Sequence, residues 1–244
     1  MGRVALVTGG SRGIGAEIAL QFSALGYDVA IIYNNNSEAA ENVVLKMREN
    51  IDNAFAFKCD VSNAFDVKAL ISQINSKLGK INVLVNNAGI ALDGLFTDTK
   101  EEEWDRVFNV NVKGVFNCTK AVLPDMINDK AGKIINISSM WGQVGASCEV
   151  AYSSSKAAVI GMTKALAKEV APSGINVNCV CPGVIKTDML GCYTDDDISA
   201  LKNQTPLGQL GTPVDIANMV SFLASDKAEF ITGQIFGVNG GYVI

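Results

Sequence analysis

Tyr152 and Lys156 stand four residues apart in the segment AYSSSKAAV, where the pattern predicts a helix over residues 152–171. Positions i and i+4 share one face of a helix, so we expect the phenol and the ammonium to lie side by side. A nearby cation favours phenolate and so lowers the pKa of tyrosine, ordinarily about 10. Such a pair could exchange a proton with a carbonyl or alcohol oxygen near neutral pH. The chain has no histidine, which excludes Ser-His-Asp and Cys-His mechanisms and leaves acid–base chemistry to tyrosine, lysine and carboxylates.

Ser139 closes a second candidate segment, the apolar run KIINISS at residues 133–139. Its hydroxyl can donate to a substrate oxygen and stabilise a developing alkoxide. Reduction of a ketone needs a hydride, which a nicotinamide supplies, and a proton, for which Tyr152 is the candidate donor.

A glycine-rich turn, TGGSRGIG at residues 8–15, follows the first apolar run and opens a helical pattern. Gly9, Gly13 and Gly15 let the backbone turn sharply and approach a pyrophosphate, whose charge the next helix N-terminus would stabilise. Its place at the first strand–helix junction favours dinucleotide binding over a purely structural turn. The turn lacks the Lys-Ser/Thr pair of a nucleoside-triphosphate P-loop.

The end of the second apolar run bears on which dinucleotide would bind. NAD-binding folds usually place a carboxylate there for the ribose 2′-hydroxyl, whereas this chain has Tyr33 and Asn34. Arg12, within the glycine turn, could pair with a 2′-phosphate. The pattern therefore favours NADP(H) over NAD(H); if Arg12 is only a solvated turn residue, the preference stays open.

Short apolar runs alternate with helical patterns along the whole chain, which predicts a parallel sheet with helices on both faces. The fold class is thus α/β: one doubly wound, Rossmann-type domain over residues 1–244, with a seven-stranded parallel sheet. The strands are expected at 3–8, 28–33, 53–61, 81–89, 133–139, 175–183 and 233–241, and the helices at 14–25, 38–50, 63–78, 101–128, 152–171 and 213–225. The least regular stretch, about 188–211, is expected to be a substrate lid.

The composition excludes several functional classes. The net charge is −5 and no long basic block exists, which argues against a nucleic-acid-binding surface. No apolar run reaches the 18 or so residues of a membrane span, and the N-terminus lacks a signal-peptide layout, so a cytoplasmic protein is expected. No metal site is expected, because the six cysteines form no C-x-x-C pair and histidine is absent; Cys59, Cys179 and Cys181 are interpreted as small buried hydrophobes. The acidic runs 101–103 and 195–197 are interpreted as solvated helix starts.

In their order and intervals, these motifs resemble the short-chain dehydrogenase/reductase family over essentially the whole chain. The matching pieces are TGGSRGIG (8–15), CDV (59–61), NNAG (86–89), NVNVKG (109–114), NISS (136–139), YSSSK (152–156) and PGVIKTDM (182–189). The resemblance implies that Tyr152 is the general acid/base, that Lys156 tunes it and holds a ribose hydroxyl, and that Ser139, rather than Ser138, binds the substrate oxygen. It also implies that Asn111 anchors a water connecting the lysine to solvent.

The same resemblance implies a set of cofactor-binding positions at the strand ends. These are Gly9, Ser11, Arg12, Gly13, Ile14, Gly15, Asn34, Asp60, Val61, Asn87, Ala88, Gly89, Tyr152, Lys156, Pro182, Gly183, Ile185 and Thr187.

Within the family, the stretch 205–241 is most similar to 3-oxoacyl-(acyl-carrier-protein) reductases of bacterial fatty-acid synthesis. This similarity implies NADPH-dependent reduction of a 3-oxoacyl thioester, on acyl-carrier protein or CoA, to the 3-hydroxyacyl thioester. It also implies a homotetramer with dimer faces on helices 101–128 and 152–171.

Two features depart from that subgroup. Ser173 stands where an arginine is common, although Lys130 keeps a positive charge before the fifth strand. The loop before Tyr152 carries Trp141 and Glu149 as candidate substrate contacts, and it looks more like paralogues thought to reduce an aminoketone modification on elongation factor P. Glu149 could contact a substrate amine, or it could be a solvated acid at a helix start. A non-catalytic dinucleotide-binding protein is the remaining alternative.

Overall fold

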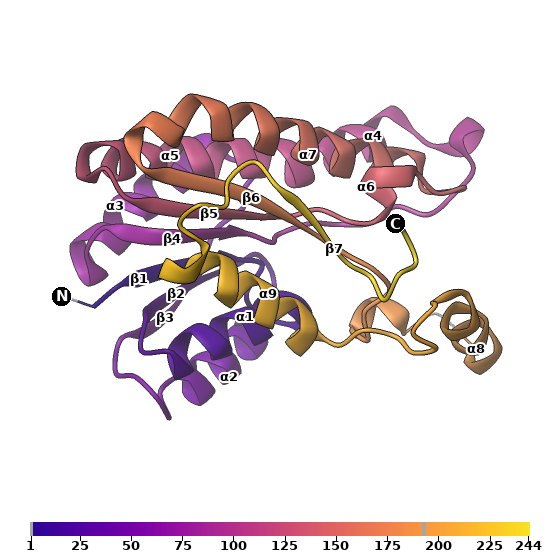
Figure 1. The fold of residues 1–244 in the computed structure, drawn as a ribbon, viewed down its shortest axis with the longest axis horizontal. Coiled ribbons are helices and arrows are strands. Elements are labelled where there is room, and N and C mark those ends of the chain that lie inside the picture. The colour runs from indigo at the N-terminus through magenta and orange to yellow at the C-terminus, as the bar shows by residue number, and fades with distance from the viewer. Residues whose placement is uncertain (1, 192–193) are drawn as a thin grey trace.

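The computed structural model describes residues 2–191 and 194–244 and contains a seven-stranded, wholly parallel sheet (Figure 1). Its strands lie in the order β3-β2-β1-β4-β5-β6-β7. They span β1 Val4–Thr8, β2 Asp28–Tyr33, β3 Ala54–Lys58, β4 Ile81–Asn86, β5 Gly132–Ile137, β6 Ile175–Pro182 and β7 Ile235–Val238. The predicted fold class and all seven strands are confirmed, with β3, β4 and β7 shorter than expected because the chain turns into loops at their carboxyl ends.

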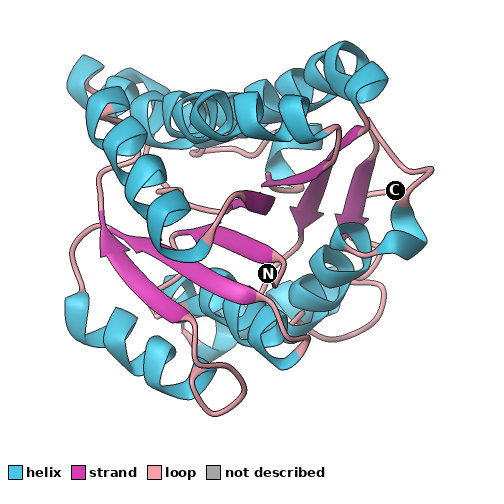
Figure 2. Cartoon of the chain, turned by 90° about the vertical axis from the view of Figure 1, so that its left-hand side faces the viewer, coloured by secondary structure: helices cyan, strands magenta, loops and turns pink. Residues whose placement is uncertain are grey.

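Helices cover both faces of the sheet, as Figures 1 and 2 show from two directions. One face packs against α1 Gly13–Ala24, α2 Ser37–Met47 and α9 Pro213–Ala224, and the other against α3 Ala64–Leu78, α5 Gly114–Asp129 and α7 Val150–Val170. Two apolar clusters fill these layers, so most strands are buried on both sides and their sequences are nearly continuous apolar runs. Cys59, Cys179 and Cys181 are buried, as predicted.

The helix predicted over residues 101–128 is interrupted. The chain forms α4 Glu101–Phe108, a π-helical segment Asn109–Lys113, and then α5. Asn111, in the interruption, bonds to the backbone of Ile90 and to Ser155, and a side chain at Gly114 would come within 2.6 Å of Val61. These contacts with distant segments cause the interruption, which the local apolar pattern does not reveal.

The stretch 188–211 is more regular than predicted, because it contains a further helix, α8 Asp195–Gln204. Thr194 and Asp197 cap its N-terminus: the Asp197 carboxylate accepts from the Thr194 amide at 2.9 Å. Residues 192–193, which the expected lid includes, lie outside the described residues. The acidic runs 101–103 and 195–197 occupy first turns, of α4 and α8, as expected.

The remaining short elements are α6 Trp141–Val144 and single helical turns at Phe96–Asp98, Ala171–Ser173, Asp188–Leu190 and Asp226–Ala228. α9 begins as its sequence predicts, with Asp215 accepting from the Thr212 amide at 2.7 Å and Pro213 in the first turn. No helix in the described part of the chain is both long and apolar enough to cross a membrane.

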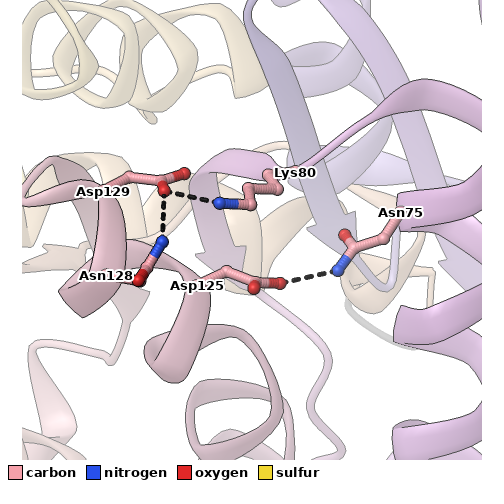
Figure 3. Close-up of polar contacts among 5 residues, drawn as sticks. All are labelled: Asn75, Lys80, Asp125, Asn128 and Asp129. Atoms are coloured by element: carbon pink, nitrogen blue, oxygen red, sulfur yellow. Dashed lines mark hydrogen bonds and ion pairs between the residues drawn. The ribbon is translucent and has the colours of Figure 1, made fainter.

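Polar contacts join α3, α5 and the loop before β4 at the amino ends of the strands (Figure 3). The Asn75 amide donates to Asp125 at 2.7 Å, and Lys80 pairs with Asp129 at the surface. Both contacts lie at the edge of the sheet opposite to the predicted site.

Candidate active site

The predicted site residues come together because parallel strands end at one edge of the sheet. Gly9 follows β1, Asp60 lies shortly after β3, Asn87 follows β4 and Ser139 lies shortly after β5, while Pro182 ends β6. In doubly wound folds, ligands bind in the crevice outside these carboxyl ends. The topology therefore brings together residues that are far apart in the sequence.

The glycine turn packs closely against the loop that follows β4. The Asn87 amide donates to the carbonyls of Thr8 at 3.0 Å and Gly9 at 3.1 Å. A Cβ at Gly15 would lie 2.3 Å from the Gly9 oxygen, and Gly9 has a positive φ of 65°. Both glycines are therefore required by this geometry.

Thr8 was missed by the sequence reasoning. The Thr8 hydroxyl accepts from the backbone N–H of Asn87 at 3.0 Å and from the backbone N–H of Ala88 at 2.9 Å. A hydroxyl residue immediately before the glycine turn was the available signal. Thr8 ties β1 to the NNAG loop, so the loop is held by its own contacts whether or not a ligand is present.

The positions expected to distinguish the two dinucleotides are at the surface. Arg12 is exposed at the start of α1, and Asn34 is exposed after β2. Asn36 caps α2 by accepting from the Ala39 N–H at 2.9 Å. The loop after β2 thus presents amides, and a ribose 2′-phosphate there would meet no nearby carboxylate from residues 33–36.

The other predicted cofactor positions divide into exposed and buried groups. Asp60 is exposed and its carboxylate accepts from the Ser62 N–H at 2.9 Å, whereas Val61 is buried. Ile185 is also buried, in the core cluster under α9. Thr187 lies beside the glycine turn, its Cγ2 3.4 Å from the Cβ position of Gly13. The loops after β1 and β6 therefore meet across the crevice.

Tyr152 and Lys156 share one face of α7, as predicted. The Lys156 Nζ lies 5.6 Å from the centre of the Tyr152 ring and donates to the Ile137 carbonyl at 2.9 Å. Burial lowers the pKa of Lys156 to about 8 and raises that of Tyr152 to about 12, with the Ser139 hydroxyl opposing the rise. The shift of Tyr152 is opposite to that predicted from spacing alone, because burial outweighs an ammonium that is bonded to the sheet.

Ser138 and Ser139 have different surroundings. The Ser138 hydroxyl donates to the Lys156 carbonyl at 2.8 Å and so joins β5 to α7. Ser139 Oγ accepts from the Trp141 N–H at 3.1 Å and affects the pKa of Tyr152 by hydrogen bonding. Ser138 holds the helix, and Ser139 is the hydroxyl placed beside Tyr152.

Asn111 connects the π-helical segment to both sides of the site. Its amide donates to the Ile90 carbonyl at 2.9 Å and to Ser155 Oγ at 3.0 Å. A Cβ at Gly89 would lie 3.3 Å from both Asn111 Oδ1 and Lys156 Nζ, so the amide and the ammonium face the same small space. This arrangement would hold a polar group between them.

The loop before Tyr152 lies at the mouth of the site. The Trp141 ring meets the Tyr242 ring edge-on, with centroids 5.6 Å apart. Glu149 is half-buried, and burial together with the charge of Asp93 raises its pKa to about 7. The Cys148 carbonyl accepts from the Gly94 N–H at 2.8 Å, which joins this loop to the one after β4.

Lys130 and Ser173 do not lie at this mouth. Lys130 stands between α5 and β5, and Ser173 stands just before β6, at the amino ends of the strands. Within one chain, both are therefore on the edge opposite to Tyr152.

Comparison with known proteins supports the resemblance to the short-chain dehydrogenase/reductase family. A family model described as enoyl-(acyl carrier protein) reductase matches residues 9–243. A 3-oxoacyl-(acyl-carrier-protein) reductase of Staphylococcus aureus is 48% identical over 241 residues, covering 99% of this chain and 98% of the relative. A reductase of the same name from Synechocystis is 45% identical, covering 99% and 97%, and an acetoacetyl-CoA reductase of Shinella zoogloeoides is 45% identical, covering 99% and 98%. The chain belongs to the short-chain dehydrogenase/reductase family.

Proposed function

We propose that this protein reduces 3-oxoacyl thioesters, carried on acyl-carrier protein or CoA, to 3-hydroxyacyl thioesters with NADPH in fatty-acid synthesis. The observation that carries the proposal is the arrangement of Tyr152, Lys156, Ser139 and Asn111 at the carboxyl edge of the sheet, beside a glycine cradle. The names of the similar reductases supply the substrate class.

The proposed roles follow from position. NADPH, when bound, supplies the hydride. Tyr152 donates its proton to the oxygen that becomes negative, and a buried phenol with a raised pKa is fully protonated at neutral pH. Ser139 donates a hydrogen bond to the same oxygen. Lys156 provides positive charge beneath the phenol, and Asn111 holds the polar space through which Lys156 can regain a proton.

The residues around the glycine turn would hold the dinucleotide. The amides at the start of α1 suit the pyrophosphate, and Asp60 and Val61 would border the adenine. Arg12 would pair with the 2′-phosphate. Arg12→Ala should raise the KM for NADPH and leave that for NADH unchanged; an equal rise for both would contradict this role.

A second candidate function has one specific observation in its favour. Glu149 and Asp93 place two carboxyl groups at the mouth, where an acidic carrier protein would be repelled and a substrate amine attracted. A ketone carrying an amine, as in a modification on elongation factor P, would suit these charges.

Initial rates with acetoacetyl-carrier protein, acetoacetyl-CoA and an aminoketone, each with NADPH and NADH, test these proposals together. Fast NADPH oxidation with either thioester supports the first. Slow thioesters and a fast aminoketone, with that rate lost in Glu149→Gln, support the second. Tyr152→Phe should abolish turnover and retain NADPH binding. If the unaltered protein binds NADPH but turns over none of these substrates, the alternative of a non-catalytic dinucleotide-binding protein is supported instead.

We also propose that the enzyme is a cytoplasmic homotetramer, as the resemblance to the reductases of fatty-acid synthesis implies. Sedimentation equilibrium tests the assembly, and a monomer at micromolar concentration would contradict it.

A further inference from the structure

Residues 239–243 form a tight turn at the carboxyl ends of β6 and β7, here called the C-terminal turn. The Asn239 side chain holds it from within, because it donates to the Val243 carbonyl at 3.0 Å and accepts from the Gly241 N–H at 3.0 Å. The Gly183 N–H, just after β6, donates to the Val238 carbonyl at 2.9 Å. The C-terminal turn is thus fixed at the same edge of the sheet as the predicted site.

The segment that follows α8 packs on the C-terminal turn without room for side chains. Gly240 and Gly241 have positive φ values of 65° and 87°. A Cβ at Gly240 would lie 2.6 Å from Thr205 Cγ2, and a Cβ at Gly241 would lie 3.2 Å from Pro206. The Leu207 N–H donates to the Gly240 carbonyl at 3.1 Å. The C-terminal turn therefore holds the chain directly after α8.

Tyr242 extends this contact to α8 itself and to the mouth of the site. Its hydroxyl donates at 2.6 Å to Oε1 of Gln204, the last residue of α8. Its ring meets the Trp141 ring edge-on, with centroids 5.6 Å apart and planes at 87°. Figure 1 shows α8 apart from the two helical layers, and the C-terminus beside α6. One half-buried side chain thus joins three segments that are distant in sequence.

The position of α8 depends on contacts at its carboxyl end. The structure describes α8 in full, and none of its residues is buried, so no apolar face holds the helix against the sheet. The residue after it, Thr205, is buried, and Gln204 bonds to Tyr242. Elements with few buried contacts open at a low free energy. A single hydrogen bond at this end therefore changes how often α8 leaves its place.

The backbone and the ring of Trp141 are held by different contacts. The Trp141 N–H donates to Ser139 Oγ at 3.1 Å. The backbone next to it is fixed at Gly142, whose Cβ position lies 2.8 Å from the backbone carbon of Lys156. The ring, in contrast, contacts Tyr242. A change at Tyr242 therefore affects the Trp141 ring and leaves the Ser139 hydroxyl in place.

We propose that Tyr242 is a positioning residue that determines how tightly the ketone substrate is held. It joins the Trp141 ring and the carboxyl end of α8 into one wall of the mouth, which receives the part of the substrate beyond the ketone group. This inference deepens the proposed function and rests on it for the identity of the ketone. Its effect falls on substrate binding and not on proton transfer, because the contacts of Ser139 do not involve Tyr242.

Trypsin cleavage of the cofactor-free chain after Lys202, in α8, tests the contact without any substrate. Tyr242→Phe and Gln204→Met each remove the bond and should speed this cleavage by about two- to fivefold, because proteolysis follows the population of the open segment. The double variant should be cleaved no faster than either single variant, since both changes remove the same bond. Tyr27→Phe is the matched control: it removes a phenolic hydroxyl just before β2, at the amino edge of the sheet, and should keep the unaltered rate.

Steady-state rates at saturating NADPH test the consequence for the substrate. Tyr242→Phe and Gln204→Met should raise the KM for the ketone by about two- to fivefold and change kcat by less than about twofold, since the lost contact serves ground state and transition state alike. Tyr242→Leu also removes the aromatic contact with Trp141 and should raise KM further. Tyr27→Phe should keep both constants.

The inference is overturned if both single variants are cleaved at the unaltered rate, or if they lower kcat and leave KM unchanged. Faster cleavage in a protein that reduces none of the ketones would contradict the proposed function and support the contact between Tyr242 and α8. Reduction of the thioesters with an unchanged KM in all the Tyr242 and Gln204 variants would do the reverse.

Discussion

Substitution of Gly15 by alanine is the sharpest test of the glycine cradle. The new Cβ would lie 2.3 Å from the Gly9 carbonyl oxygen and 2.4 Å from Asn87 Nδ2, so the Asn87 amide must move. Overpacking costs about 1–3 kcal/mol, and each of the two Asn87 hydrogen bonds contributes about 1 kcal/mol. Alanine has a higher helix propensity than glycine, which offsets about 1 kcal/mol of this loss of stability. A net loss of ~3 kcal/mol lowers the Tm of a chain of this length by about 6–12 °C.

Thermal unfolding and NADPH titration of the cofactor-free chain measure both effects. NADPH affinity should fall together with Tm, because the displaced amide also disturbs the turn. Gly161→Ala is the matched control: Gly161 lies in α7 with nothing within 4 Å of its Cβ position, so this change should stabilise the chain by up to about 1 kcal/mol. A Gly15→Ala variant with unchanged Tm and unchanged NADPH affinity would refute the close-packing argument.

Three further outcomes are expected. Ser138→Ala should cost about 1 kcal/mol of unfolding free energy through its lost bond to α7 and leave kcat nearly unchanged. Ser139→Ala should cost a similar amount through its lost bond from the Trp141 N–H, and should also lower kcat by about 10²–10³-fold. Lys156→Met should stabilise the chain at pH 7 by about 3 kcal/mol, because the folded pKa of about 8 lies below the unfolded value of about 10.4. In urea unfolding, this advantage should shrink as the pH rises from 8 to 10, where the unaltered chain gains stability. Lys80→Ala should leave Tm unchanged, since the Lys80–Asp129 pair is at the surface.

Much of the fold was predictable because its determinants are local. Short apolar runs, mostly ended by glycine, asparagine or proline, marked the seven strands, and Thr212, Pro213 and Asp215 marked the start of α9. The glycine turn was predictable for the same reason, since its glycines lie within one short stretch of the chain, residues 9–15.

The features that sequence reasoning missed depend on distant contacts. The π-helical segment arises where Asn111 meets Ile90 and Ser155, and no local period reports those partners. The pKa of Tyr152 depends on burial and on the bond between Lys156 and the Ile137 carbonyl, whereas i,i+4 spacing specifies only a shared face. α8 was hidden because its polar, acidic sequence lacks an apolar stripe.

The strand order has a consequence for how the chain is assembled during synthesis. β2 joins one side of β1 and β3 joins β2; β4 then joins the other side of β1, and β5, β6 and β7 follow in turn. Each new strand thus pairs at an existing edge, and none must be inserted between two strands already paired. Since a chain is synthesised from its N-terminus, the glycine turn and the NNAG loop are made before Tyr152. The glycine turn thus precedes the helix that carries Tyr152 in time as well as in sequence.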